Sequence, residues 1–143
     1  MINNNPRSYV NTCIIGNNDK ESLGLGSISN QNMLNQILDI PPIHTISCTS
    51  YGTFLLDFDG NVWSFGSNTL GQLGLGHNKN VNIPTKIEDL NDIQQISCGC
   101  CAFGYFLAKD SQSKIFAAGA NYYGQLGMAV YNGDLKNTGN INP

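Results

Sequence analysis

The chain has few charged residues and no long apolar run. Only 12% of its 143 residues are charged, its seven lysine and arginine residues are dispersed, and its formal net charge is -3. A nucleic-acid footprint needs clustered basic residues, so we do not expect a nucleic acid as partner. No stretch approaches the roughly eighteen apolar residues of a membrane span, and residues 1–7 hold no signal-peptide core. These absences predict an intracellular protein, cytoplasmic or nuclear, without a membrane partner.

The chain does contain an internal repeat. Leu23–Gly26 returns fifty residues later as Leu73–Gly76, and Ile46–Cys48 returns at the same offset as Ile96–Cys98. A fixed period of this size is typical of solenoids, propellers and arrays, whose units bury their apolar faces against neighbours. Three copies of one unit, the first degenerate, therefore make up most of the chain.

Each unit contains short apolar runs separated by turn residues. In the second unit the runs are Ile43–Cys48, Thr53–Phe58 and Val62–Phe65, and in the third they are Ile93–Cys98, Phe103–Lys109 and Ile115–Ala118. Runs of this length predict strands. Asp59-Gly60 predicts a two-residue hairpin turn that pairs the second run with the third. A further stretch around Pro84–Ile87 predicts an edge strand, because proline cannot donate to a central ladder.

One stretch departs from the strand pattern. In the segment Asn32–Asp39 the apolar residues have the spacing i, i+1, i+4, i+5, which places Met33, Leu34, Ile37 and Leu38 on one face of a helix. The segment belongs to an insertion in the first unit. A short helix and its absence are equally open here.

Units of antiparallel strands that repeat with glycine-rich turns are typical of propeller blades. The predicted fold is all-β: a partial β-propeller with blades of three to four antiparallel strands and a repeat of about 50 residues, not closed within one chain. The predicted divisions are an N-terminal polar segment 1–12, a degenerate partial repeat with an insertion 13–42, repeat units 43–92 and 93–130, and a polar C-terminal tail 131–143.

A family resemblance rests on two of these units. Val62–Asn68, Gly71–Gly76 and Ile93–Gly99, together with the third copy Ile115–Gly127, resemble the repeat of the regulator of chromosome condensation. The resemblance implies propellers that close with seven blades and, in one class of the family, guanine-nucleotide exchange on a small GTPase. The chain departs from the pattern in the first unit, where Lys20–Gly24 keeps only half of the turn motif.

The length of the chain conflicts with a closed ring of the family's kind. Seven blades at this period need about 350 residues, whereas the chain supplies two full units and part of a third. Uncovered blade faces expose apolar surface. We therefore expect either a fragment or subunit of a larger assembly, or a chain that associates with copies of itself.

The five cysteines favour packing over chemistry. Cys98, Cys100 and Cys101 lie close together, but structural zinc usually takes two Cys-x2-Cys pairs. In the repeat, Cys48 and Cys98 fall at equivalent strand ends, and Cys13 aligns with the core-strand position of the only tryptophan. We expect structural packing, no metal, no cofactor and no disulfide.

Three further features have a structural and a functional interpretation. The turn Gly71–Gly76 could cradle a phosphate, but no helix or lysine motif follows it, so we interpret it as scaffold, with Leu73 and Leu126 filling the core between blades. For Trp63 core packing is favoured over ligand stacking. For Asp57 and Asp59 solvated turn positions are favoured over a catalytic pair, and no nucleophile stands beside a base. The sequence predicts no enzyme activity.

Binding residues of repeat scaffolds tend to lie on loops. The candidate interaction residues are those of two equivalent loops, and adjacent tyrosines are common on binding surfaces. They are Asn68, Thr69 and Leu70 in the second unit and Asn121, Tyr122 and Tyr123 in the third. Packing on the next blade is an equal interpretation for the tyrosines.

Three functions remain open. We favour a non-catalytic protein-protein interaction module that binds a protein partner. The family resemblance places guanine-nucleotide exchange on a small GTPase second, although no extra projecting hairpin is present in these units. The third is a self-assembling structural subunit that completes a ring or filament from several copies, because heterologous contacts between blade faces close or propagate.

Overall fold

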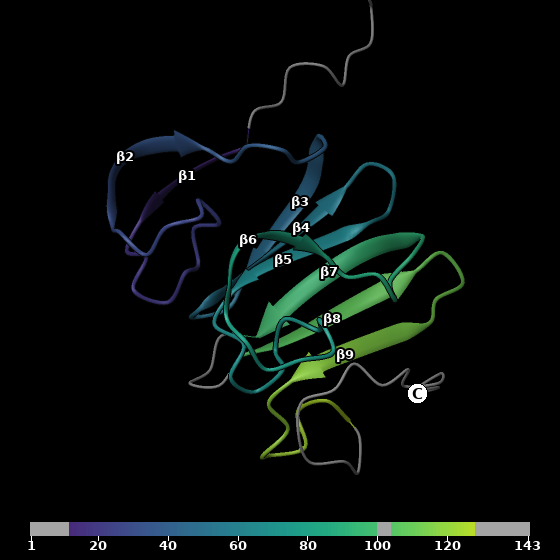
Figure 1. Cartoon of the computed structure of the whole chain (residues 1–143). Coiled ribbons are helices and arrows are strands. Elements are labelled where there is room, and N and C mark those ends of the chain that lie inside the picture. The colour runs from purple at the N-terminus through teal and green to yellow at the C-terminus, as the bar shows by residue number, and fades with distance from the viewer. Residues whose placement is uncertain (1–11, 100–103, 128–143) are drawn as a thin grey trace, which may run out of the picture.

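The structure is a computed structural model, and it describes residues 12–99 and 104–127. All regular elements in these two ranges are strands (Figure 1). They are β1 (Cys13–Gly16), β2 (Gln31–Gln36), β3 (Ile43–Cys48), β4 (Gly52–Asp57), β5 (Val62–Gly66), β6 (Val81–Lys86), β7 (Ile93–Gly99), β8 (Tyr105–Asp110) and β9 (Ile115–Gly119). The predicted terminal segments lie outside the described residues, apart from Thr12.

The strands form three antiparallel sheets in chain order. Blade 1 is β1-β2, blade 2 is β3-β4-β5-β6 and blade 3 is β7-β8-β9. The strands β1 and β2 precede β5 and β6 by the repeat offset, so blade 1 supplies the second half of a blade. The sheets follow one another across the molecule without closing a ring (Figure 1). The predicted partial propeller is confirmed.

The β4–β5 hairpin is confirmed, but the predicted turn is wrong. Leu55 pairs with Trp63 across the two strands. The strands are separated by four residues, and of the predicted turn pair only Gly60 has a positive φ, 81°. Its N–H donates to the Asp57 oxygen at 3.3 Å. A longer loop forms because the Asp57 carboxylate also binds backbone N–H groups of the turn, at Asp59 and Asn61.

The possible helix in Asn32–Asp39 is wrong. Residues Gln31–Gln36 form β2, and Ile14 of β1 pairs with Asn35. Met33 and Leu34 are exposed, so the apolar spacing does not mark a buried helical face. The antiparallel ladder with β1 pairs backbone groups of β2. In blade 1, β2 occupies the position that β6 occupies in blade 2. In β6 the predicted edge strand is confirmed, with Pro84 inside it.

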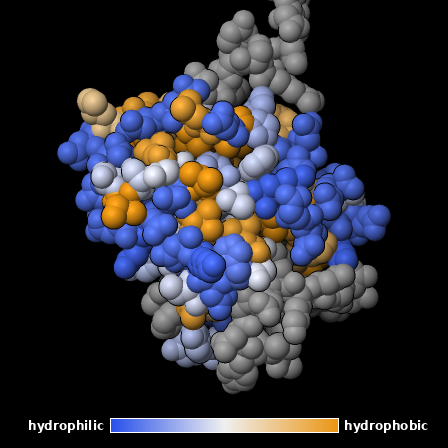
Figure 2. Space-filling model, in the orientation of Figure 1, coloured by the Kyte–Doolittle hydropathy of each residue, from blue (hydrophilic) through white to orange (hydrophobic). Residues whose placement is uncertain are grey.

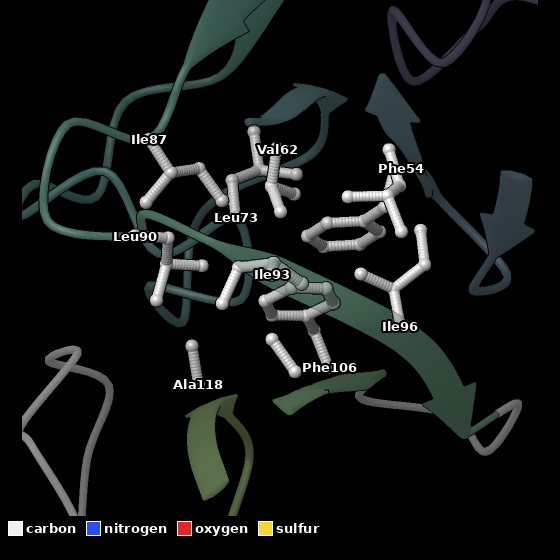
Figure 3. Packing of buried hydrophobic residues seen from close by; sticks show 11 residues of the cluster. Phe54, Val62, Leu73, Ile87, Leu90, Ile93, Ile96, Phe106 and Ala118 are labelled. Atoms are coloured by element: carbon white, nitrogen blue, oxygen red, sulfur yellow. The ribbon is translucent and has the colours of Figure 1, made fainter. Parts of the chain in front are cut away.

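Blade 2 is packed on both faces, and every residue of β4 is buried. Because side chains alternate along a strand, Phe54 and Leu56 face blade 3 while Leu55 faces blade 1. The larger cluster fills the space between blades 2 and 3 (Figure 3). In it the rings of Phe54 and Phe106 stack with centroids 4.3 Å apart. The two sheets are thereby joined across one continuous core.

The scaffold interpretation of the glycine turn is confirmed. Gly71, Gly74 and Gly76 all have positive φ values, which suit glycine because it has no Cβ. Leu73 is fully buried in the cluster between blades 2 and 3, and Leu126 is buried at the equivalent place of blade 3. The turn therefore carries one core side chain per blade.

Candidate functional site

The strand directions sort the loops of each blade into two rims. The first rim holds the loops that follow β1, β3, β5 and β9, and the second rim holds those that follow β2, β4, β6 and β8. Contacts between blades keep the rims aligned. On the first rim Thr53 of blade 2 donates to the Ser22 oxygen of blade 1 at 2.9 Å, and on the second rim Ile93 of blade 3 donates to the Gly60 oxygen of blade 2.

The turns of the first rim that follow β1, β5 and β9 are each built around a buried asparagine. Its side-chain oxygen accepts the backbone N–H five residues later: Leu23 to Asn18 at 2.9 Å, Leu73 to Asn68 at 2.9 Å, and Leu126 to Asn121 at 3.0 Å. The Asn68 amide also donates to the His77 oxygen at 2.6 Å, as Asn18 does to Ser27. These side chains face inward and satisfy the backbone of their own turns.

Two of the candidate interaction residues thus belong to the scaffold. Asn68 is fully buried and Asn121 is 7% exposed, so neither side chain is presented to a partner. The burial has a physical reason. Each turn carries buried N–H and C=O groups that need a partner, and an asparagine supplies both an acceptor and a donor.

The other four candidates stand on the outside of these turns. Thr69 is exposed and Leu70 is half-buried, whereas Tyr122 is 45% and Tyr123 is 88% exposed. Glutamines two residues beyond hold the loop backbone: the N–H of Leu70 donates to Gln72 and the N–H of Tyr123 to Gln125, both at 2.9 Å. The structure therefore presents two tyrosines from a turn that is held at both ends.

Sequence reasoning missed two residues of this rim. Tyr51 lies in the β3–β4 loop and is 45% exposed, with the Lys20 ammonium 5.9 Å from its ring centroid. The Tyr51 oxygen accepts the N–H of Ser67, the residue before the buried asparagine. No repeat signal marks Tyr51, because the equivalent place in the next unit holds Cys101. It extends the exposed surface toward blade 1.

Asp57 is not the solvated turn residue that the sequence suggests. It is 3% exposed, and its carboxylate accepts hydrogen bonds from Asp59, Asn61 and Trp63 at 2.9 to 3.1 Å. Burial alone raises the pKa of Asp57, but the hydrogen bonds from the side chain and backbone of Asn61, from Trp63 and from Asp59 outweigh it, and the pKa lies below its ordinary value. The carboxylate is charged and serves the turn. Asp59 is exposed.

Trp63 packs against the cluster between blades 1 and 2, which confirms the structural interpretation of this residue. The three described cysteines differ in part from the prediction of packing: Cys13 and Cys48 are exposed, whereas Cys98 packs against a core cluster. The exposure of Cys13 follows from its place on the face of blade 1 that no described strand covers. Cys100 and Cys101 lie outside the described residues.

Residues 12–99 and 104–127 contain neither a metal-binding cluster nor a membrane-spanning helix. No group of three or more histidine, cysteine, aspartate or glutamate residues in these ranges is placed to hold a metal ion. The same ranges contain no helix long and apolar enough to cross a membrane. The N–H groups of Gly71 and Gly74 donate to backbone oxygens of their own turn, so they do not form an anion cradle.

Comparison with known families and structures agrees with this architecture. The blades, their glycine turns and the unclosed order define a segment of a β-propeller. The repeat described as "Regulator of chromosome condensation (RCC1) repeat" matches residues 59–101, and a second profile of the same description matches residues 43–72. Residues 43–101 of the chain therefore match RCC1 repeats. No curated protein gives a significant match to the sequence.

Solved structures show the same fold. Human WBSCR16 is 22% identical with a TM-score of 0.69, covering 86% of this chain and 33% of that one. Prp20p of Saccharomyces cerevisiae, whose structure is described with its binding properties to Gsp1p and histones, is 16% identical with a TM-score of 0.69 and covers 85% and 33%. Yeast RCC1 (Prp20) bound to Kap60 is 14% identical, with a TM-score of 0.73 and coverage of 92% and 32%. The chain spans about a third of the length of these proteins.

Proposed function

We propose that this chain is a non-catalytic protein-protein interaction module that binds a protein partner through its first rim. The observation that carries the proposal is the pair Tyr122 and Tyr123, which the turn holds outward while its polar groups are satisfied inside. A tyrosine on a fixed turn contributes contact area at small entropic cost. The related propellers that bind Gsp1p, histones or Kap60 support a role in protein binding.

The other side chains of the first rim fit a role in binding. The side chains of Asn68 and Asn121 and of Gln72 and Gln125 accept hydrogen bonds from the backbone of their own turns. The charged groups of the first rim are two acids, Asp19 and Glu21, and two lysines, Lys20 and Lys79. Lys20 lies over an aromatic ring. This chemistry suits recognition of a protein surface.

The test compares the full chain with the double variant Tyr122→Ser plus Tyr123→Ser as bait in an extract of its native cells. The matched control is Met33→Ser plus Leu34→Ser, which also replaces two exposed large side chains, on blade 1. We expect partners that are captured by the wild type and the control but lost with the tyrosine variant. Equal capture by all three proteins would contradict the proposal.

Guanine-nucleotide exchange is a second candidate, favoured by the similarity to the protein whose binding to Gsp1p is described. It predicts that the chain accelerates release of a fluorescent GDP analogue from Gsp1p. We expect no acceleration, because internal hydrogen bonds hold the turns that follow β5 and β9 on the first rim. Acceleration abolished by the tyrosine variant would instead favour exchange through the same rim.

Self-assembly is a third candidate, favoured by the outer face of blade 3. Leu107 and Ile115 on this face are half-buried, whereas their equivalents Phe54 and Val62 are fully buried between blades. Light scattering over a tenfold concentration range tests it. A discrete oligomer would favour assembly, and a monomer would favour binding to another protein.

A further inference from the structure

An uncharged and partly apolar surface on blade 1 and the adjoining β6 takes no part in the proposed function. Residues 22–38 contain no charged side chain. Four large apolar residues of this stretch and one of β6 are more than half exposed: Ile28, Met33, Leu34, Leu38 and Ile83. In Figure 2 hydrophobic residues reach the surface over β2 and β6, from the upper left to the centre of the view. A concentration of exposed apolar side chains is typical of a surface that binds another molecule.

Met33 and Leu34 form a protrusion on this surface, because β2 bulges at this point. Between two paired positions β2 holds three residues, 32–34, where β1 holds one. The exposed fractions of Met33 and Leu34 are 76% and 67%. The Asn35 amide donates to the Met33 oxygen at 2.8 Å and to the side-chain oxygen of Gln31 at 3.1 Å. These hydrogen bonds hold the bulge, so the protrusion is in place before anything binds to it.

A hollow of about 480 Å3 lies beside the protrusion, between blade 1 and β6 of blade 2. Its lining includes Gln31 and Asn35, which flank the protrusion in β2. The apolar part of the lining comes from both blades: Leu25, Leu38, Ile83 and Pro84. The N–H of Gly26 donates to the Asn82 oxygen at 2.8 Å, which ties blade 1 to β6. The hollow is therefore a fixed feature of the fold, and its volume lies within the roughly 300–1,000 Å3 of ligand clefts.

The arrangement of this surface favours a second copy of the chain as the occupant of the hollow. The protrusion and the hollow lie side by side, so a two-fold axis between two copies can place each protrusion in the hollow of the other. Such an interface meets itself, and a charged side chain near the axis would face its own like charge. Residues 22–38 carry no charge, and among the described lining residues of the hollow only Asp39 is charged. A partner that binds through charge finds little to recognise here.

We propose that this surface is the interface of a homodimer, in which the protrusion of each copy fills the hollow of the other copy. Methionine suits this role because its unbranched side chain adapts to an irregular pocket, and interfaces are enriched in methionine and depleted of charge at their centre. The dimer stops at two copies, whereas contacts between blade faces would close a ring or propagate. It leaves the tyrosines of blade 3 to another partner.

Sedimentation velocity of the full chain over a hundredfold concentration range tests the proposal. Met33→Asp places a charge on the protrusion, and Ile83→Asp places one in the hollow. The matched control is Ile46→Asp, which adds the same charge at an isoleucine of β3 that is 52% exposed, close to the 55% of Ile83. Circular dichroism checks that each variant is folded.

We expect the wild type to dimerise, with a dissociation constant that rises by more than about tenfold in Met33→Asp and in Ile83→Asp, because two-fold symmetry buries each new carboxylate twice. The Ile46→Asp control and the tyrosine double variant should dimerise as the wild type does, which separates this interface from the proposed function.

A mixture of the two variants tests the contact itself. The intact protrusion of the Ile83→Asp protein can enter the intact hollow of the Met33→Asp protein, so the mixture should recover part of the association that each variant lacks alone. Fluorescent labelling of one of the two proteins detects the mixed dimer.

Three results would overturn the proposal. A wild type that stays monomeric over the whole range would assign the surface to a different protein. An oligomer that persists in both Met33→Asp and Ile83→Asp would place self-association elsewhere, as on the outer face of blade 3. A mixture that recovers no association would show that the protrusion and the hollow do not engage each other.

Discussion

Replacing the buried asparagine of the blade 2 turn should be among the most damaging single changes in this protein. Asn68 is fully buried, accepts the Leu73 N–H at 2.9 Å and donates to the His77 oxygen at 2.6 Å. Asn68→Ala removes both hydrogen bonds, each worth about 0.5–1.5 kcal/mol, and leaves the buried Leu73 N–H without an acceptor, which costs about 1–3 kcal/mol. We expect the free energy of unfolding to fall by about 2–4 kcal/mol.

Equilibrium unfolding in urea measures this loss, with the fluorescence of Trp63 as the probe because the chain has one tryptophan. Asn80→Ala is the matched control: Asn80 accepts the N–H of Asn68 at 2.9 Å, but it is exposed and water can replace its oxygen. The control should cost less than about 1 kcal/mol. The reasoning is refuted if both variants lose the same free energy, or if Asn68→Ala costs less than the control.

Three further predictions concern the scaffold. Because the pKa of Asp57 lies below its ordinary value of 3.8, its stabilising contribution is present above about pH 4 and is lost as the pH falls through the lowered pKa. Urea unfolding at stepped pH should show a smaller acid-induced loss in Asp57→Asn than in the wild type; an equal loss would contradict this. Gly66→Ala should destabilise by at least about 2 kcal/mol, since its Cβ would meet the β3–β4 turn backbone. Gly76→Ala, in open space, should lose only about 1–2 kcal/mol, and equal losses would refute the clash. A double-mutant cycle of Phe54→Leu and Phe106→Leu should give a coupling of about 0.5–1.5 kcal/mol, and a value near zero would exclude the stacking contribution.

The strands and the order of the blades could be predicted from the repeat, because each apolar run of one unit recurs about fifty residues later as the equivalent strand of the next blade. The same fifty-residue repeat also indicates the correct secondary structure of the insertion in the first unit. Gln31–Gln36 precedes Val81–Lys86 by fifty residues, which indicates a strand. The helical spacing of Met33 and Leu34 was misleading, because both side chains are exposed and no core selects their face.

The candidate site was predictable in part. Tyr122 and Tyr123 differ from their equivalents in the second unit, and the structure places both on the surface. Asn68 and Asn121 are identical at equivalent positions and recur as Asn18, which indicates a constant requirement of the turn. The burial of Asp57 could not be foreseen from hydropathy, since an aspartate is buried only where several N–H groups converge on it.

The two rims differ in chemistry because the repeat constrains them differently. On the first rim the turns that follow β1, β5 and β9 each use a buried asparagine to satisfy their own backbone N–H groups, so the side chains beside the asparagine are the ones that can vary. On the second rim the close approach of Gly60 to Asp92 and the backbone hydrogen bond from Ile93 to Gly60 join neighbouring blades. Strands of six residues such as β4 separate the rims by about 20 Å. A partner bound to the tyrosines of the first rim would therefore leave the second rim uncovered.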